Sequence, residues 1–321
     1  MRTTLAVASL TTILTFIQPP VRSPALTFEF QSNFWVNLHH LVRGDARRAS
    51  LKLPVVVRLE SLPPDERTGW SEALSAYSDV AAKNLIFDPG LISINNALSA
   101  LTGADVPTGL VDESIRHALT LASGVYRTHG WLDQEHRNAA WIADTRPQVE
   151  RHAAAMASAL AAAYHASWKP GLIVVDACVE AGPNNAYTTA GPPGTAGHTV
   201  VAVRTPSNSG DAGVETIFHE ASHTIDDQIA RPFIDEATRQ HVRFPDGLDH
   251  AILFYTTGEI MRREFARTGT PGYVPYGDRF GVYKNGWQTF RTALEKDWLP
   301  YLDGKASFDN AVTTLVRDAT R

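Results

Sequence analysis

A chain of 321 residues with 44% hydrophobic and 20% charged residues is long enough and apolar enough to bury a substantial core. Its formal net charge of -5 provides no basic surface for nucleic acid, and it argues against an anionic membrane as the main partner. Cys178 is the only cysteine, which excludes an intramolecular disulfide and predicts a buried structural thiol. Nothing in the sequence sets an oligomeric state.

The first 25 residues carry the pattern of a secretory signal peptide. Arg2 gives a positive start, a mostly apolar stretch runs from Leu5 to Ile17, and small residues follow up to Ala25. The apolar stretch is short for a bilayer-spanning helix, which favours a cleaved signal over an uncleaved anchor. We therefore expect a secreted or periplasmic protein, cleaved after Ala25 and without a stable membrane span once the signal is removed.

Residues 26–170 predict a predominantly helical N-terminal layer. One strand is expected in it, at residues 53–59, where Pro54 suits a strand start or an edge. The last helix is Ala-rich and is expected to begin near Pro147, because proline suits the first turn of a helix. The predicted helical segments are 34–43, 70–87, 91–101, 110–127 and 138–168.

Residues 171–321 predict a small sheet beside an amphipathic helix. Two apolar, β-branched runs, 171–178 and 198–204, are typical of buried strands, and the Gly- and Pro-rich segment between them predicts a long loop. Further helices are expected from about Asp249 to Thr268 and from Trp287 to Trp298 or beyond. The predicted fold class is α+β, with the helical layer packed on this second half.

An HExxH motif at residues 219–223 follows the second predicted strand. Residues i and i+4 share one face of a helix, so His219 and His223 can bind one zinc ion. Glu220 lies beside the first of them and can take a proton from a zinc-bound water. Pro232 is expected to end this helix. Its helical periodicity comes from an apolar stripe: Val214, Ile217, Phe218, Ala221, Ile225 and Ile229.

Strand, short polar loop and HExxH helix together resemble the zincin superfamily of zinc metallopeptidases. The resemblance implies a zinc-dependent hydrolase acting on a peptide or protein substrate, with Glu220 as general base and His219 and His223 as zinc ligands. It also implies that the strand before the helix edges the substrate cleft. The metzincin spacing would need Gly and His where Asp226 and Ile229 stand, so the resemblance covers the motif and its immediate setting and points to no particular family.

A catalytic zinc normally has three protein ligands and one open position. His250 is the first candidate for the third ligand, because it shares the apolar face of the helix that begins near Asp249. Glu259 is the alternative. It falls roughly opposite His250 and could pair with neighbouring arginines, yet a Glu on the second helix is the usual third ligand in gluzincin-like proteins. Asp226 or Asp227, one turn past the motif, is a further possibility.

Several other residues are weaker candidates for the site. Asp226 could orient a ligating imidazole from behind. A tyrosine could steady an oxyanion opposite the zinc, and isolated histidines could line a cleft, although these residue types are more often structural. The tyrosines are Tyr255, Tyr273, Tyr276 and Tyr283, and the histidines are His39, His40 and His136.

Two other functions are compatible with the motif. The chain could be a non-catalytic zinc-containing binding module on a zincin scaffold, or a zinc hydrolase that acts on a bond other than a peptide bond. The presence of Glu220 speaks against a purely binding role, because a site that only holds metal has no need of a base.

Overall fold

The computed structural model describes residues 26–182 and 184–320, so the signal peptide predicted at residues 1–25 lies outside the described residues. The described chain is mostly helical with one four-stranded sheet, which confirms the α+β class. None of its helices combines the length and the apolar composition that crossing a membrane requires.

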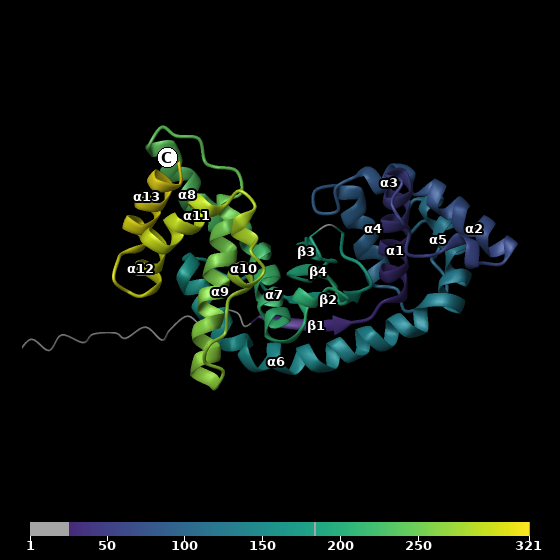
Figure 1. Ribbon diagram of the computed structural model, residues 1–321, viewed down its shortest axis with the longest axis horizontal. Helices are drawn as coiled ribbons and strands as arrows, with labels where there is room; N and C mark the ends of the chain where they lie inside the picture. Colours follow the sequence, from purple (N-terminus) through teal and green to yellow (C-terminus); the bar gives the residue numbers. More distant parts are fainter. Residues whose placement is uncertain (1–25, 183, 321) are drawn as a thin grey trace, which may run out of the picture.

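Helices from the first part of the chain form a lobe at one end of the molecule (Figure 1). Asn33 begins the first of them by accepting hydrogen bonds from the backbone N–H groups of Trp35 and Val36. Trp35 and Val36 are then buried in the core of the lobe. The helices are α1 (Phe34–Ser50), α2 (Pro64–Ala76), α3 (Ser78–Ala82), α4 (Pro89–Ser99) and α5 (Glu113–Tyr126).

The strand predicted at residues 53–59 is wrong. The buried carboxylate of Asp45 accepts hydrogen bonds from the backbone N–H groups of Val56 and Val57. A side chain thus satisfies the donors that a neighbouring strand would otherwise pair. Leu53 and Val56 are 53% and 43% exposed, so this apolar run lies at the surface and not in a core.

The sheet lies at the centre of the molecule, between the two lobes (Figure 1). Its strand order is β1-β2-β4-β3, with β1 and β4 parallel to β2 and with β3 antiparallel at one edge. The predictions at residues 171–178 and 198–204 are confirmed by β2 (Leu172–Cys178) and β4 (Gly197–Ala202). Two short strands were not predicted: β1 (Thr27–Gln31) and β3 (Ala186–Thr189), which interrupts the predicted loop.

The sheet separates two hydrophobic cores. Side chains alternate between the faces of a strand, so Cys178 and Val200 join the core of the N-terminal lobe, whereas Ile173, Val175 and Val201 join the other core. The long helix α6 (Leu132–Tyr164) packs on that second core. The residues of β1 and α6, which belong to the predicted N-terminal layer, therefore lie against the C-terminal half.

Two helices contain a proline that was expected at a helix end. Pro147 lies inside α6, and Pro232 lies inside α8 (Asp226–Arg239). Proline removes the hydrogen bond to the carbonyl four residues earlier. Those carbonyls belong to Ala143 and Gln228, which are exposed residues, so water can satisfy them. Both predictions are wrong for the same reason: water can replace the missing hydrogen bond, and the packing of each helix keeps it helical past its proline.

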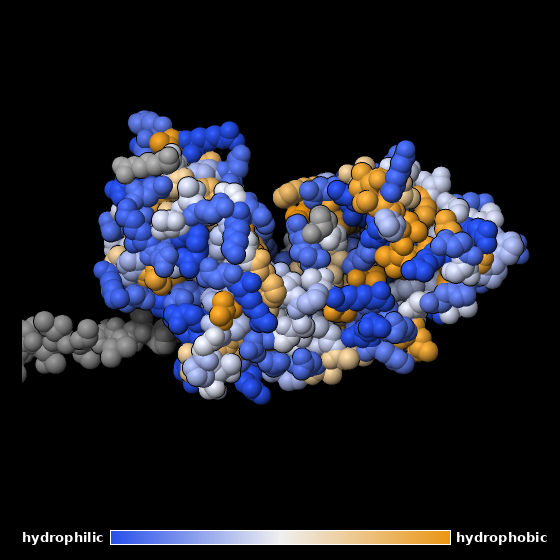
Figure 2. Space-filling view, in the orientation of Figure 1, coloured by the Kyte–Doolittle hydropathy of each residue, from blue (hydrophilic) through white to orange (hydrophobic). Residues whose placement is uncertain are grey.

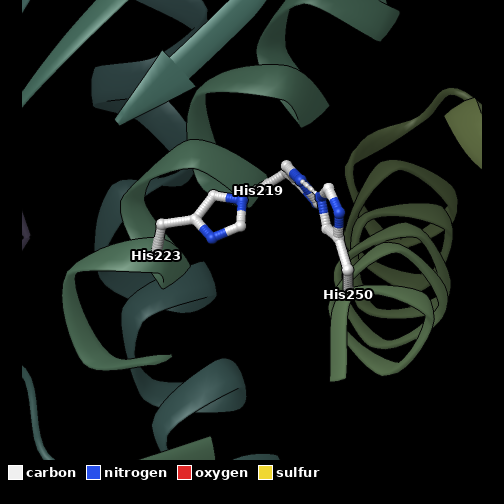
Figure 3. Close-up of side chains that lie close together, drawn as sticks. All are labelled: His219, His223 and His250. Atoms are coloured by element: carbon white, nitrogen blue, oxygen red, sulfur yellow. Dashed lines mark hydrogen bonds between the residues drawn. The ribbon is translucent and has the colours of Figure 1, made fainter. Parts of the chain in front are cut away.

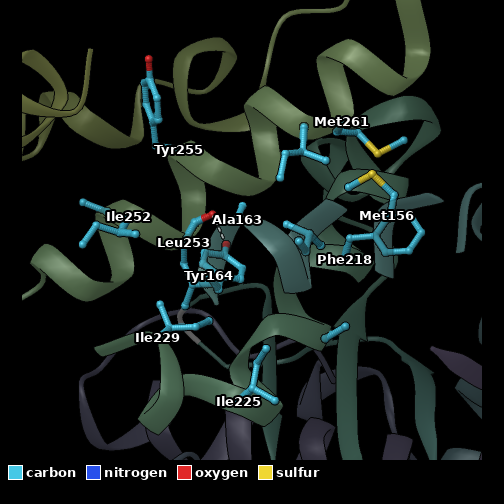
Figure 4. Close-up of a cluster of buried hydrophobic side chains, with 14 of the residues drawn as sticks. Met156, Ala163, Tyr164, Phe218, Ile225, Ile229, Ile252, Leu253, Tyr255 and Met261 are labelled. Atoms are coloured by element: carbon cyan, nitrogen blue, oxygen red, sulfur yellow. Dashed lines mark hydrogen bonds between the residues drawn. The ribbon is translucent and has the colours of Figure 1, made fainter. Parts of the chain in front are cut away.

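The C-terminal lobe is built around α7 (Gly210–Ser222) and α9 (Leu248–Thr268), and α9 confirms the helix expected from Asp249 to Thr268. Phe218 of α7, Met156 of α6, and Leu253 and Met261 of α9 belong to one buried hydrophobic cluster (Figure 4). Each such side chain contributes roughly 1.5–3 kcal/mol by burial, which fixes α7 against α9. The helix expected from Trp287 to Trp298 or beyond is present as α11 (Gln288–Ala293), a π-helical turn and α12 (Leu299–Leu302) in direct succession, and a further helix, α13 (Phe308–Ala319), follows.

Candidate metal centre

The HExxH motif spans the junction of two helices. α7 ends at Ser222, and His223–Ile225 form a 3-10 turn before α8 begins. The apolar stripe predicted for this segment is buried, which turns the opposite edge of α7 towards the cleft. The rings of His219 and His223 meet edge to face with centroids 5.0 Å apart, so the break leaves the one-turn spacing of the two imidazoles intact.

His250, in the first turn of α9, completes a cluster of three imidazoles (Figure 3). Its Nε2 lies 3.1 Å from Nε2 of His219. One ring nitrogen from each of His219, His223 and His250 lies within 4.8 Å of the other two. Zinc with tetrahedral Zn–N bonds of about 2.0–2.1 Å would hold its ligand nitrogens roughly 3.3 Å apart. The cluster is therefore close to the spacing that zinc requires.

Glu259, the alternative third ligand, lies away from this cluster. Its carboxylate accepts hydrogen bonds from the guanidinium groups of Arg262 and Arg263, at 2.6 and 2.8 Å. Nine residues of helix place it opposite His250, as the periodicity predicts. Of the candidates weighed from the sequence, His250 is the one that the structure brings to the motif imidazoles.

Asp226 contacts His223 from behind the cluster, in the orienting position that is one of the two roles predicted for it. Nδ1 of His223 lies 2.9 Å from Oδ2 of Asp226, so Nδ1–H donates to the carboxylate and the lone pair of Nε2 is free to face the other two rings. Asp227 is exposed and forms no ion pair with any described residue. Nδ1 of His219, in contrast, is buried without a hydrogen-bond partner among the described residues.

The electrostatic environment favours neutral imidazoles at two of the three positions. Burial lowers the pKa of His219 well below its ordinary value, and neighbouring imidazoles lower it further. Burial and the charge of His223 lower the pKa of His250 to about 3. Burial also lowers the pKa of His223, but the hydrogen bond to Asp226 and the charge of Glu220 outweigh it and raise the pKa overall. Neutral imidazole is the form that binds a metal.

Glu220 lies beside the cluster, held by the edge strand of the sheet. The hydroxyl of Thr188 donates a hydrogen bond to Oε2 of Glu220 at 2.9 Å and accepts one from Thr199 at 2.7 Å. Burial raises the pKa of Glu220 above its ordinary value, which makes its carboxylate a stronger base. Thr188 was missed in the sequence because β3 lies in a segment whose composition predicts a loop.

A cleft between the two lobes exposes these groups, and Figure 2 shows the molecule hollowed there. On the side of the N-terminal lobe it is lined by the loop between α3 and α4, where Phe87 is 76% exposed. On the opposite side lie the three imidazoles, Glu220 and the start of α9. β3 edges the cleft. The strand expected there from the zincin resemblance, β4, lies inside the sheet between β2 and β3.

The outer edge of β3 presents backbone groups towards the cleft. The carbonyl of Asn185 accepts a hydrogen bond from the N–H of Ala202, so the alternation of antiparallel pairing turns the N–H and C=O groups of Ala186 and Thr188 away from β4. Ala186 and Thr188 both line the cleft. Among residues 26–182 and 184–320 no strand pairs with this edge, which runs beside Glu220.

The four candidate tyrosines have different surroundings. Only Tyr276 lines a pocket together with His219 and Glu220, and its hydroxyl donates to Oγ of Ser207 at 3.0 Å. The hydroxyl of Tyr273 donates to Glu215, Tyr255 lies under the guanidinium of Arg291, and Tyr283 is buried against Gly277.

The isolated histidines do not line the cleft. His39 and His40 are buried in α1 and hydrogen-bond to the hydroxyls of Tyr77 and Tyr187. His136 is exposed on α6. These residues are structural or exposed, the commoner role for single histidines.

Comparison with protein-family models, with curated proteins and with solved structures finds no match to this chain, so the case for the metal centre depends on its own geometry.

Proposed function

We propose that this chain is a zinc-dependent hydrolase that cleaves peptide bonds. The observation that carries the proposal is the convergence of ring nitrogens from His219, His223 and His250 within 4.8 Å, with Glu220 next to them in the same cleft. Three imidazoles are a common protein ligand set for catalytic zinc, and they leave the fourth tetrahedral position open.

Zinc at this centre would supply Lewis-acid chemistry, lowering the pKa of a water to about 7 and polarising a carbonyl. Thr188 holds Oε2 of Glu220, which leaves Oε1 to accept a proton from the attacking water. The protonated carboxyl can then donate that proton to the leaving amine, so the carboxylate is regenerated in each cycle. Asp226 keeps His223 in the tautomer whose Nε2 faces the centre.

The free edge of β3 favours an extended peptide or protein as the substrate. Backbone N–H and C=O groups of Ala186 and Thr188 can pair with an extended chain laid along the strand, and such pairing does not depend on the substrate's side chains. It would bring the chain past Glu220, which contacts the same strand. The N-terminal signal pattern adds a secreted or periplasmic location to the proposal.

Turnover of a mixed peptide library by the zinc-loaded protein and by Glu220→Gln tests the proposed function. We expect about one zinc per chain in both proteins and turnover only in the parent, because the amide cannot accept the proton. Zinc without turnover in either protein would favour the non-catalytic binding module. Turnover restricted to esters or other non-peptide bonds would redirect the proposal to another hydrolase, and protein that binds no zinc would end it.

A further inference from the structure

A small polar pocket continues from the metal cleft along α7. It shares Asn184, Ala186, His219, Glu220 and Phe254 with the cleft, so the two spaces adjoin. Its remaining lining consists of Asn208, Glu215, Thr216 and Tyr276. A substrate group next to the scissile bond would therefore have a separate polar compartment within reach.

Glu215 brings a carboxylate into this pocket without a cation to balance it. It lies one helical turn before His219 and is only 1% exposed. Its oxygens accept hydrogen bonds from the hydroxyl of Tyr273 at 2.6 Å and from the N–H of Tyr276 at 3.0 Å, and both of these donors are neutral. No Lys or Arg is among the described residues that line the pocket. A buried carboxylate without a counter-charge costs folding free energy.

The fold makes room for this carboxylate. A Cβ at Gly258 of α9 would lie 3.1 Å from Oε1 of Glu215 and 2.7 Å from Cβ of Pro275. Gly258 therefore allows α9, the segment before α10 (Tyr276–Arg279) and the carboxylate to meet. A side chain at position 258 would crowd both the carboxylate and Pro275, so the glycine is part of what accommodates the buried Glu215.

A second acceptor points to the same kind of ligand. Asn208 is 1% exposed, and its side-chain N–H group donates to the backbone carbonyls of Asn185 and Ala202. Those two bonds fix the orientation of the amide, whose side-chain oxygen is an acceptor. Glu215 and Asn208 both line the pocket, so a carboxylate and an amide contribute acceptor oxygens to the lining, and a group rich in donors suits such a lining.

We propose that this pocket binds a positively charged nitrogen group of the substrate, an ammonium or a guanidinium, with Glu215 as its counter-charge. The proposal extends the proposed peptidase function and assigns Glu215 as a determinant of specificity. The charge can come from a Lys or Arg side chain or from the N-terminal ammonium of a peptide, and these sources present the same chemistry to Glu215.

Kinetics on paired peptides tests the proposal. Each peptide carries Lys or the nearly isosteric neutral norleucine at positions flanking the scissile bond, with a free or an acetylated N-terminus. We expect the parent to prefer the charged member by at least roughly tenfold in kcat/KM, and Glu215→Gln to lose that preference. Loss of the preference on acetylation would assign the pocket to the N-terminal ammonium, and its persistence would assign it to a side chain. Glu72→Gln, an exposed change on α2, is the matched control.

A binding measurement separates this proposal from the peptidase proposal. Butylammonium and butylguanidinium should bind the parent and raise its Tm, butanol should not, and Glu215→Gln should lose the difference. If the protein hydrolyses no peptide, this measurement still decides the pocket. The proposal would be overturned if cationic probes bound both proteins equally. It would also be overturned if Glu215→Gln lost the same rate on charged and neutral peptides. In either case Glu215 would only support the segment that carries Tyr276.

Discussion

The Nε2 atoms of His219 and His250 lie 3.1 Å apart although 31 residues separate them in the chain. The ring of Phe254 stacks on His219 at 4.0 Å, so an apolar contact between α7 and α9 sets this distance before any metal is bound. The two imidazoles are thus preorganised, and less ordering free energy is lost when a third group or ion joins them.

His250→Ala should reduce zinc affinity by at least roughly 100-fold, because the site would keep only two of its three imidazole ligands. Glu259→Ala should leave zinc affinity unchanged, since Glu259 pairs with Arg262 and Arg263. Competition with a chromogenic chelator measures both constants. Equal affinities in the two variants would contradict the assignment of His250.

Asp226→Asn should weaken zinc binding by about tenfold, because the carboxylate that accepts the Nδ1–H of His223 also raises the basicity of that ring. The neighbouring Asp227→Asn is the control, since Asp227 is exposed. The same chelator competition gives the result. Indistinguishable affinities would mean that the contact to His223 has no effect on the metal centre.

Thr188→Val should lower kcat by about tenfold while zinc content and KM stay the same, because valine keeps the shape but cannot donate to Glu220. Thr189→Val, the next residue of β3, makes no contact with Glu220 and serves as control. Steady-state kinetics on one peptide substrate decides between them. A fall in both variants would point to damage to the strand and not to the lost hydrogen bond.

Glu215→Gln should stabilise the protein more at pH 8 than at pH 5. Burial raises the pKa of Glu215 to about 7, so the folded state disfavours the charged form. The parent therefore loses stability as pH rises from about 4.5 towards 7, by up to about 3 kcal/mol, and the loss is constant above that range. Urea unfolding of both proteins at the two pH values gives the difference, and other groups that titrate in both proteins cancel. A difference that does not change with pH would contradict a raised pKa.

Gly258→Ala should destabilise the protein by about 1–3 kcal/mol, because the new methyl group would lie 2.7 Å from Pro275. Alanine in an open helix position has the opposite effect, so Gly124→Ala in α5, where a Cβ would meet nothing within 4 Å, should stabilise by up to about 1 kcal/mol. Denaturant unfolding measures both changes. If both substitutions stabilised the protein, the segment before α10 would have to move aside freely to make room for the added methyl group.

Helical periodicity predicted the part of the site that lies on helices. The choice of His250 over Glu259 follows from which face of α9 is apolar. The apolar face of a helix is the face that packs against the rest of the protein, so this prediction does not depend on the details of the fold. Glu215 had a detectable signal that was overlooked: an acidic residue one turn before His219, next to the apolar stripe of α7.

The contribution of β3 could not be predicted in the same way. A four-residue strand inside a Gly- and Pro-rich segment has no periodicity to detect, and only its pairing with β4 makes it a strand. Thr188 therefore depends on a contact between segments, which local sequence does not encode. β1 could not be predicted for the same reason, because it is short and is formed by its pairing with residues 172–176.

That pairing has a consequence for the order of folding. Helices α1 to α5 pack largely on one another, whereas β1 must wait for a partner that begins at Leu172. Closing so long a loop is slow because its entropy is lost before the pairing compensates. The sheet, and with it the strand whose Thr188 contacts Glu220, is therefore expected to assemble late, so that Glu220 and the three imidazoles come together only after most of the chain has left the ribosome.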